Sequence, residues 1–300
     1  MKIGFTFTNY NNSLLSIQAA QSIAAHHGDC DYQIILVDNA STEAERRILA
    51  APGTLPPYCD VVWNADNVGY FGGLNLGLAA LRSGASDYDA IVIGNNDLVF
   101  EADFFAALQR RSDVLARYPV LAPNIITLDG QHQNPHVLVG ISRFREMVWD
   151  LYFAHFRLSQ LIGWAANRAR AYVGRKDHLA YADEGVIYAG YGACYILTPC
   201  FWLHYAQLWS PGFLMGEEFY LARQLAAKDE QMYYVPDILV RHYDHATVSK
   251  LPSRRLWEMT RQYHRIYRFF ISPYRIIMDN GKSPADYDLS VGTKVRLPLI

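Results

Sequence analysis

The chain has 300 residues, of which 51% are hydrophobic and 14% aromatic, and its formal net charge is −2. This length and composition suffice for a large buried core, so we expect a globular chain of one large domain or two tightly joined ones. The four cysteines show no paired spacing, which indicates neither a zinc site nor a disulfide framework. No segment has the layout of a signal peptide or enough apolar length to span a bilayer, so we expect a cytoplasmic protein.

Charge is distributed unevenly along the chain. Residues 1–100 contain ten acidic and four basic side chains, a net of −6, whereas residues 143–176 contain seven basic and two acidic ones, a net of +5. If the acidic first part of the chain binds a polyanion, it requires a divalent cation to offset the repulsion between like charges. The basic aromatic segments are typical of a region that binds an anionic surface.

The first hundred residues read as strands that alternate with helices, an order that predicts an α/β fold with a mostly parallel, doubly wound sheet. The expected strands are 2–8, 33–37, 61–63 and 90–94, and the expected helices are 13–25, 42–50 and 73–81. Polar or glycine-rich loops follow the strands at 9–12, 38–41, 67–73 and 95–97. Because the carboxyl ends of parallel strands share one edge of a sheet, we expect these loops to form one binding site.

The rest of the chain is more helical. The expected elements are a helix at 101–118, a helix start at Thr198 and Pro199, a helix at 217–227, a strand at 232–240 and an aromatic helical tail at 254–271. Between them, an apolar stripe at helical spacing runs from Phe144 to Ala165 with arginines beside it. This stripe is expected to be a core helix, a dimer contact or a membrane-surface contact.

Asp97 is the most informative acid, because it follows the apolar run at 90–94 directly after Asn95 and Asn96. A carboxylate at the end of a buried strand can bind a divalent cation, and that cation can in turn bind a diphosphate. The competing interpretation is a cap for the helix that begins near Glu101. The dinucleotide fingerprint and the P-loop motif are both absent.

Taken in order, these segments resemble the family 2 glycosyltransferases, inverting enzymes of the GT-A fold that build bacterial surface polysaccharides, including rhamnosyltransferase-like members. The resemblance lies in a Thr-x-Asn turn at 7–11, a Val-Asp-Asn-Ala-Ser-Thr segment at 37–42, a glycine-rich loop at 67–77, and Asn95-Asn96-Asp97 at the place of the family's metal-binding acid. Later, Gly192-Ala193, Phe213, Glu217-Glu218, Pro236 and His242 keep the family's order. Four such loops in the correct strand context are a specific signal.

The resemblance implies a metal-dependent transfer of a sugar from a nucleoside diphosphate donor to a hydroxyl of a growing glycan. It implies Mg²⁺ or Mn²⁺ held by Asp97 and His242, and a UDP- or dTDP-linked donor. The implied donor contacts are Thr8, Asn9, Asp38, Asn67, Gly69, Gly73 and Asn96. The implied acceptor is a glycan or lipid-linked glycan, with no nucleic acid; contact with the inner face of the cell membrane and homo-oligomer formation stay open.

The resemblance also implies a division of the chain. A nucleotide-sugar-binding part would cover 1–125, an acceptor-binding and catalytic part 126–250 with a helical insertion at about 143–175, and a helical tail 251–300.

Inverting transfer needs a carboxylate that removes the proton from the acceptor hydroxyl. Glu217-Glu218 resembles the family's Glu-Asp pair, whose second member is the base, so Glu218 is the predicted base. Tyr220 replaces a further family Asp and Arg223 stands one position early, which keeps Glu217 open as the base. Two acids at a helix start also complement the helix dipole without any catalytic role.

Several alternatives stay open. Asp38 and Asn39 can serve only as turn formers, and a lone histidine such as His242 is more often structural. A catalytically inactive nucleotide-sugar-binding protein would keep the first hundred residues and lose the base. A nucleotidyltransferase would carry a basic, glycine-rich phosphate loop after the first strand, where this chain has Asn9-Tyr10-Asn11-Asn12.

Overall fold

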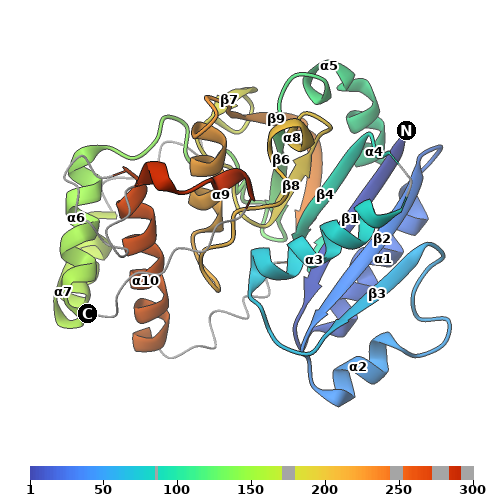
Figure 1. Ribbon diagram of the computed structural model, residues 1–300, viewed down its shortest axis with the longest axis horizontal. Coiled ribbons are helices and arrows are strands. Elements are labelled where there is room, and N and C mark those ends of the chain that lie inside the picture. The colour runs from blue at the N-terminus through green and yellow to red at the C-terminus, as the bar shows by residue number, and fades with distance from the viewer. Residues whose placement is uncertain (85–86, 171–179, 244–252, 272–283, 292–300) are drawn as a thin grey trace.

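The computed structural model describes residues 1–84, 87–170, 180–243, 253–271 and 284–291. Among these residues one nine-stranded sheet forms the centre of the molecule, in the order β3-β2-β1-β4-β8-β6-β9-β5, with β7 paired to β9 (Figure 1). The strands are β1 Lys2–Asn9, β2 Asp31–Asn39, β3 Cys59–Asn64, β4 Ala90–Asn95, β5 Leu98–Val99, β6 Val120–Thr127, β7 Gly185–Ile187, β8 Cys194–Leu197 and β9 Met232–His242.

The first four strands confirm the predicted parallel sheet. β1 pairs in parallel with both β2 and β4, and β2 pairs in parallel with β3. The sheet then becomes mixed, because β8 runs antiparallel between β4 and β6. Strands from the predicted donor-binding and catalytic parts thus share a single sheet.

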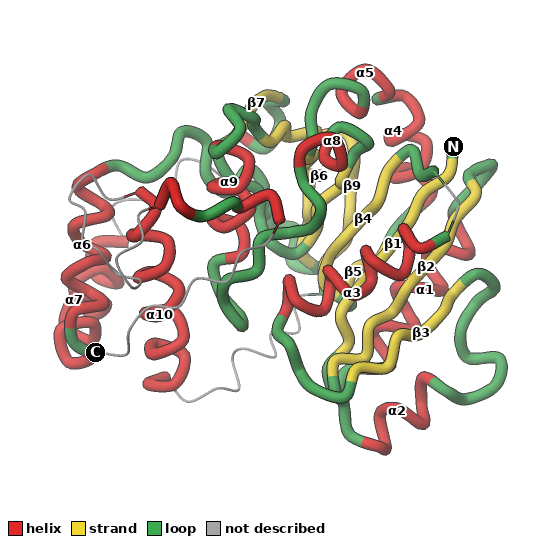
Figure 2. Tube along the Cα trace, in the orientation of Figure 1, coloured by secondary structure: helices red, strands yellow, loops and turns green. Residues whose placement is uncertain are grey.

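The helices cover both faces of the sheet (Figure 2). They are α1 Ser13–His26, α2 Glu43–Leu49, α3 Tyr70–Ser83, α4 Ala102–Arg110, α5 Ser112–Leu115, α6 Arg143–Ala154, α7 Phe156–Arg170, α8 Phe201–His204, α9 Glu217–Ala226 and α10 Ser253–Ile271, with 3-10 turns at Pro284–Asp286 and Leu289–Val291. One buried cluster packs α1 and α4 against the sheet, and a second packs α3, α8 and α9 against the opposite face. Burial on both faces explains the continuous apolar runs of β2 and β4.

Several predicted elements need correction. The helix expected at 101–118 is two helices, α4 and α5, because Arg111 leaves helical geometry at ψ 34°. The stripe from Phe144 to Ala165 is also two helices, since His155 is extended between α6 and α7. The helix expected to start at Pro199 begins instead at Phe201, where Thr198 Oγ1 accepts a hydrogen bond from Cys200 N.

Four strands of the sheet were not predicted: β5, β6, β7 and β8. β5 and β7 are only two and three residues long. β6 contains Pro123, which weakens a strand signal, and its register with β9 shifts between Pro123 and Asn124. β8 has only four residues, fewer than a pattern of alternation needs to stand out.

The helices α6, α7 and α10 lie together at the end of the molecule opposite β3 (Figure 1). Arg268 of α10 forms ion pairs with Glu146 and Asp150 of α6 at 2.8 and 2.7 Å, and His264 Nε2 lies 2.8 Å from Asp150 Oδ1. Residues 171–175 of the predicted insertion, and most of the tail after 271, lie outside the described residues. No helix in the described ranges is long and apolar enough to cross a bilayer.

Candidate active site at the carboxyl edge of the sheet

Asn9 joins the loops that follow β1, β2 and β4, as predicted for loops at one sheet edge. Its side chain is fully buried; Nδ2 donates to Asp38 Oδ2 at 3.0 Å and to Ser41 Oγ at 3.1 Å. Its Oδ1 accepts from Ser16 Oγ at 2.9 Å and from Asn96 Nδ2 at 3.3 Å. The Asn9 side chain therefore holds the loops together from within, and its predicted donor contact would have to come from its backbone.

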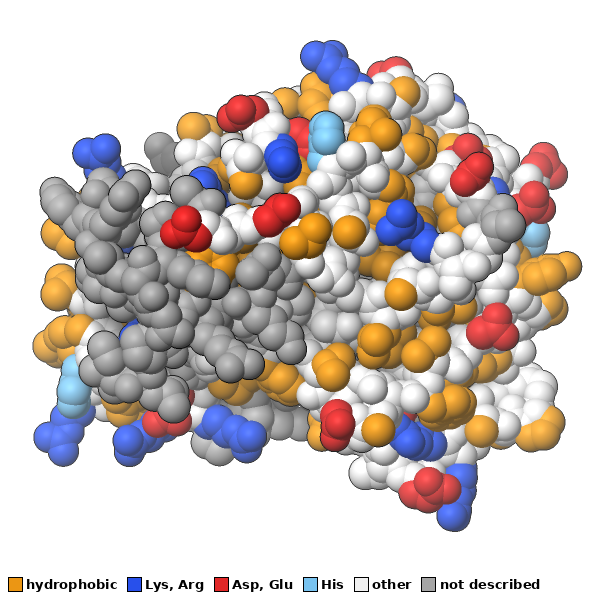
Figure 3. Space-filling view, in the orientation of Figure 1, with side chains coloured by type: hydrophobic (Ala, Val, Ile, Leu, Met, Phe, Trp, Pro, Cys, Tyr) orange, Lys and Arg blue, Asp and Glu red, His pale blue; other side chains and the backbone are white. Residues whose placement is uncertain are grey.

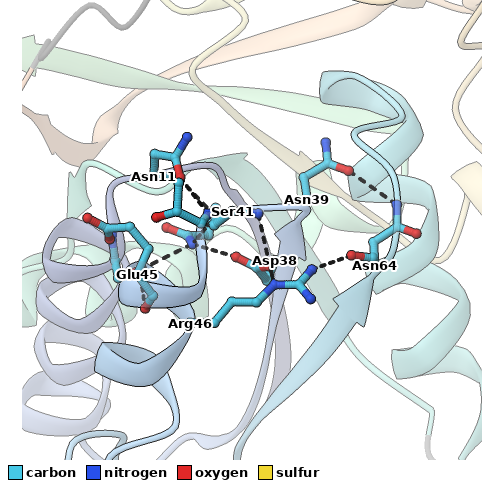
Figure 4. Close-up of polar contacts among 10 residues, drawn as sticks. Asn11, Asp38, Asn39, Ser41, Glu45, Arg46 and Asn64 are labelled. Atoms are coloured by element: carbon cyan, nitrogen blue, oxygen red, sulfur yellow. Dashed lines mark hydrogen bonds and ion pairs between the residues drawn. The ribbon is translucent and has the colours of Figure 1, made fainter.

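Asp38 is also enclosed, by an arginine that the sequence analysis did not single out. Arg46 Nε of α2 donates to Asp38 Oδ1 at 2.7 Å, and Arg46 also donates to the backbone oxygen of Asn64 (Figure 4). Its guanidinium carbon lies 5.7 Å from the centre of the Trp63 ring. Since the Asp38 side chain is 0% exposed, a donor base would contact Asp38 only after Arg46 moves, and otherwise meets Arg46 and Trp63 first.

Asn39 fastens the loop at 67–73 to the end of β2. Its Nδ2 donates to Asn67 Oδ1 at 2.9 Å and to Gly69 O at 3.0 Å, while its Oδ1 accepts from Val68 N at 3.1 Å. The amide of Asn67 is therefore part of the loop's own structure. Its role as a donor contact stays a prediction.

The glycines of this loop permit close backbone contacts. Gly69 has φ +84°, and a Cβ there would lie 2.0 Å from the backbone oxygen of Phe213. The next amide, Tyr70 N, donates to that same oxygen at 3.0 Å. Gly73 faces β1, where a Cβ would lie 2.4 Å from Thr8 Cγ2. Thr8 and Gly73 thus let α3 pack closely on the sheet at the edge of the site.

Asp97 and His242, the predicted metal ligands, meet although they are far apart in the chain. Pairing of β5 with β9 places Asp97 Oδ1 3.1 Å from His242 Nε2, and both side chains are nearly buried. His242 Nδ1 lies 2.7 Å from Gln133 Oε1, and Asn95 Nδ2 lies 3.3 Å from His242 Nε2. Because an amide oxygen only accepts, the Gln133 contact favours a proton on Nδ1, the tautomer in which Nε2 can bind a cation.

This donor set fits a divalent cation. Asp97 Oδ1 and His242 Nε2 lie 3.1 Å apart, the spacing of two neighbouring ligands on one divalent cation with metal–ligand distances of about 2.1 Å. Within the described parts of the chain, no group of three or more His, Cys, Asp or Glu side chains could hold a metal on its own. Asp97 and His242 therefore suit an ion that takes its remaining ligands from a diphosphate, as Mg²⁺ commonly does.

The turn at Gly192 and Ala193 joins the Asp97 side of the edge to the acidic pair on α9. Asn95 N donates to Ala193 O at 2.9 Å, and Tyr70 Oη donates to Gly192 O at 2.9 Å. A Cβ on Gly192 would lie 3.6 Å from Glu218 Oε2. The end of β4, the start of α3 and the start of α9 therefore border the same turn.

Glu217 and Glu218 begin α9 in different surroundings. Glu217 is 7% exposed, and its burial, followed by the charge of Glu218, raises the pKa of its carboxyl to about 8. Glu218 is more open, at 21%, and its Oε1 lies 3.9 Å from His136 Nε2. Gly216, at φ +79°, sets the start of this helix, and Tyr263 of α10 packs directly against it.

Among the comparisons with known proteins, the one with solved structures bears on the fold. No known protein-family model and no curated protein sequence matches the chain. GalNAc-T7, solved with UDP, GalNAc and Mn²⁺, aligns with a TM-score of 0.51 and 11% identity over 90% of this chain, which spans about half (48%) of that chain. The mannosyltransferase PcManGT from Pyrobaculum calidifontis, solved with GDP-Man and Mn²⁺, aligns with a TM-score of 0.48 and 15% identity over 89% of this chain and 62% of its own. The chain has the GT-A glycosyltransferase fold, as predicted.

Proposed function

We propose that this protein is a metal-dependent inverting glycosyltransferase that moves a sugar from a nucleoside diphosphate donor to a hydroxyl of a growing glycan. The observation that carries the proposal is the turn at Gly192 and Ala193. It contacts the end of β4, which leads into Asp97, and it borders Glu218 on the other side. Such a transfer needs side chains that hold a cation and a carboxylate that acts as a base, and both border this one turn.

In this reaction the acceptor oxygen attacks the anomeric carbon while its proton passes to a carboxylate oxygen of the protein. The bond between the anomeric carbon and the diphosphate oxygen breaks, and its electron pair leaves with the diphosphate. A cation held by Asp97 and His242 would neutralise charge on that diphosphate. The proposed donor is UDP- or dTDP-linked, and the proposed setting is surface polysaccharide synthesis in the cytoplasm.

Glu218 is the proposed base. At neutral pH the buried carboxyl of Glu217 keeps its proton because its pKa is raised to about 8, so it does not accept another. Glu218 is the more exposed of the two and borders the turn at Gly192. Adjacent carboxyls with different surroundings commonly divide into one neutral and one ionised group.

The proposal includes a contact of α6 and α7 with an anionic membrane surface, where a lipid-linked acceptor would lie. Phe144, Leu161 and Trp164 are 71, 61 and 56% exposed. The acids of α6 turn inward to Arg268, whereas Arg157 and Arg168 of α7 are exposed. In Figure 3, hydrophobic side chains line the left edge, at the place of α6 and α7, with basic side chains above and below them. This combination suits anionic lipid.

Thermal unfolding of the protein with UDP, dTDP or GDP, each with and without Mn²⁺, tests donor binding. A ligand that binds only the folded state raises its stability, by about 2.7 kcal/mol at 100 times Kd. One nucleotide is expected to raise the Tm, and to do so only with Mn²⁺. Asp97→Asn should remove the Mn²⁺ dependence. No shift with any nucleotide would contradict the proposed donor class.

A further inference from the structure

We propose that His136 is a positioning residue for Glu218, which holds the carboxylate toward the acceptor and makes its basicity depend on the protonation of the imidazole. This inference rests on the proposed function, because it assigns a partner to the proposed base. His136 Nε2 lies 3.9 Å from Glu218 Oε1. The sequence analysis did not single out His136.

The loop that carries His136 is held firmly on both sides. The Asn134 side chain is fully buried; its Nδ2 donates to Pro123 O of β6 at 2.7 Å, and its Oδ1 accepts from Tyr191 N at 2.7 Å. Val137 N donates to Ala189 O at 2.9 Å, and Ala189 N donates to Val137 O at 3.1 Å. These bonds tie the loop to the strand beneath it and to the segment that leads into the Gly192 turn.

The His136 ring is also confined. Its centre lies 5.7 Å from the Tyr191 ring and 6.1 Å from the Phe219 ring, and the residue is 9% exposed. Glu218 in turn has the Gly192 turn on one side and His136 on the other. An imidazole fixed in this way limits the directions that the Glu218 carboxylate can take.

The charge of His136 matters because its Nε2 lies 3.9 Å from a carboxylate oxygen of Glu218. Among the described residues, the titratable groups near this pair include Tyr191 beside His136, and Glu217, Tyr195, Tyr220 and Tyr263 around Glu218. The three tyrosines around Glu218 have their pKa values raised well above the ordinary value of 10, chiefly by burial, and stay neutral. A protonated His136 would stabilise the carboxylate of Glu218 and make it a weaker base.

The pH dependence of kcat separates this role from a purely structural one. For the wild type we expect kcat to rise with pH as the imidazole loses its proton. His136→Gln should lower kcat about tenfold to a hundredfold, remove that step and leave the donor KM unchanged. His204→Gln is the control, because His204 of α8 also faces a carboxylate, with Nδ1 2.6 Å from Glu230 Oε1, outside the site. A wild-type pH profile in His136→Gln would overturn the inference.

A double-mutant cycle keeps the test independent of transfer. The Tm values of His136→Gln, Glu218→Gln and the double variant are measured at pH 5.5 and 8.5, with His204→Gln and Glu230→Gln as the control cycle. A coupling between His136 and Glu218 that is larger at pH 5.5 is expected. Additive effects at both pH values would overturn the inference even in an active enzyme. Coupling in a protein that transfers no sugar would support the pair while the proposed function fails.

Discussion

At the scale of single residues, the site depends on carboxyl groups that have the same chemistry and different surroundings. Asp38 is enclosed by Arg46, Asp97 faces His242, Glu217 is buried, and Glu218 is the most open of the four. Burial and partners, and not residue type, decide which of these groups is ionised and which can meet a substrate. Substitutions of one carboxyl at a time therefore have distinct consequences.

Glu218→Gln is expected to reduce transfer by about 10² to 10⁴-fold, the usual contribution of a general base. Donor binding should survive, because the Gly192 turn lies between the Glu218 side chain and the end of β4, which leads into Asp97. Single-turnover transfer and the nucleotide-induced Tm shift measure the two effects separately. Unchanged transfer would remove Glu218 from the mechanism, and a donor shift without any wild-type transfer would indicate an inactive binding protein.

Glu217→Gln is expected to alter how stability depends on pH. The pKa of Glu217 is raised from 4.5 to about 8, so between these values the folded protein holds a proton that the unfolded chain releases. The free energy of unfolding of the wild type should therefore fall as pH rises across this window, by a few kcal/mol in total. Glutamine stays neutral, so the variant should gain stability relative to the wild type from pH 5 to pH 8.

Urea unfolding of the two proteins at several pH values measures this difference. Glu43→Gln is the control, because the Glu43 side chain is 73% exposed. If Glu217→Gln and the wild type kept a constant difference across the window, Glu217 would not be held neutral in the folded protein.

At the scale of secondary-structure elements, the site is an assembly of loops fastened to one another. Asn9 joins the loops after β1, β2 and β4, and Asn39 joins the end of β2 to the loop before α3. Phe213 O then accepts from Tyr70 N, which connects that loop to the segment leading into α9. The predicted donor loop is therefore hydrogen-bonded to the segment that leads to Glu217 and Glu218.

Gly69→Ala tests this coupling. At φ +84° an alanine is strained, and its Cβ would lie 2.0 Å from Phe213 O, so the two segments must separate. The free energy of unfolding is expected to fall by about 2 to 4 kcal/mol. The nucleotide-induced Tm shift is expected to be lost. Gly53→Ala is the matched control, because Gly53 has φ +74° with no atom within 4 Å of an added Cβ.

Gly53→Ala should cost about 1 kcal/mol for the positive φ alone and leave the nucleotide shift intact. Equal losses in both variants would mean that the contact between Gly69 and Phe213 adds nothing to the strain of the backbone.

At the scale of the whole molecule, the predicted donor loops and the helices α6, α7 and α10 occupy different ends, with α9 between them (Figure 1). The acids of α6 face α10, which leaves the outer side of α6 and α7 apolar and basic. This arrangement would set a membrane-bound acceptor beside α9 while a soluble donor enters from the opposite side.

Arg157→Ser with Arg168→Ser is expected to weaken binding to phosphatidylglycerol-rich vesicles about thirtyfold, since each arginine near an anionic surface contributes about 1 kcal/mol. Vesicle flotation at low and high salt measures the effect. Arg47→Ser with Arg110→Ser removes the same charge from exposed positions on α2 and α4. Equal weakening in both pairs, or equal binding to phosphatidylcholine vesicles, would contradict docking through α6 and α7.

The amino-acid sequence by itself determined the first four strands and the helices between them. Residues 90–94 form a strand that is buried on both faces of the sheet, so its sequence is a continuous apolar run without alternating polar residues. Such a run can be recognised from neighbouring residues in the sequence. The parallel order of β1 to β4 and the shared edge of their loops follow from the alternation of these strands with helices. The motif order also led to Asp97 and His242 as a pair and to the GT-A fold.

Several other side-chain contacts were decided by the tertiary structure alone. The antiparallel entry of β8 brings the Gly192 turn between Asp97 and Glu218, and no local pattern predicts a four-residue strand in that position. The enclosure of Asp38 by Arg46 and the approach of His136 to Glu218 likewise join segments with no common periodicity. Burial also raises the pKa of Glu217. Because burial is a property of the packed chain, the sequence alone does not show which of two adjacent glutamates is buried.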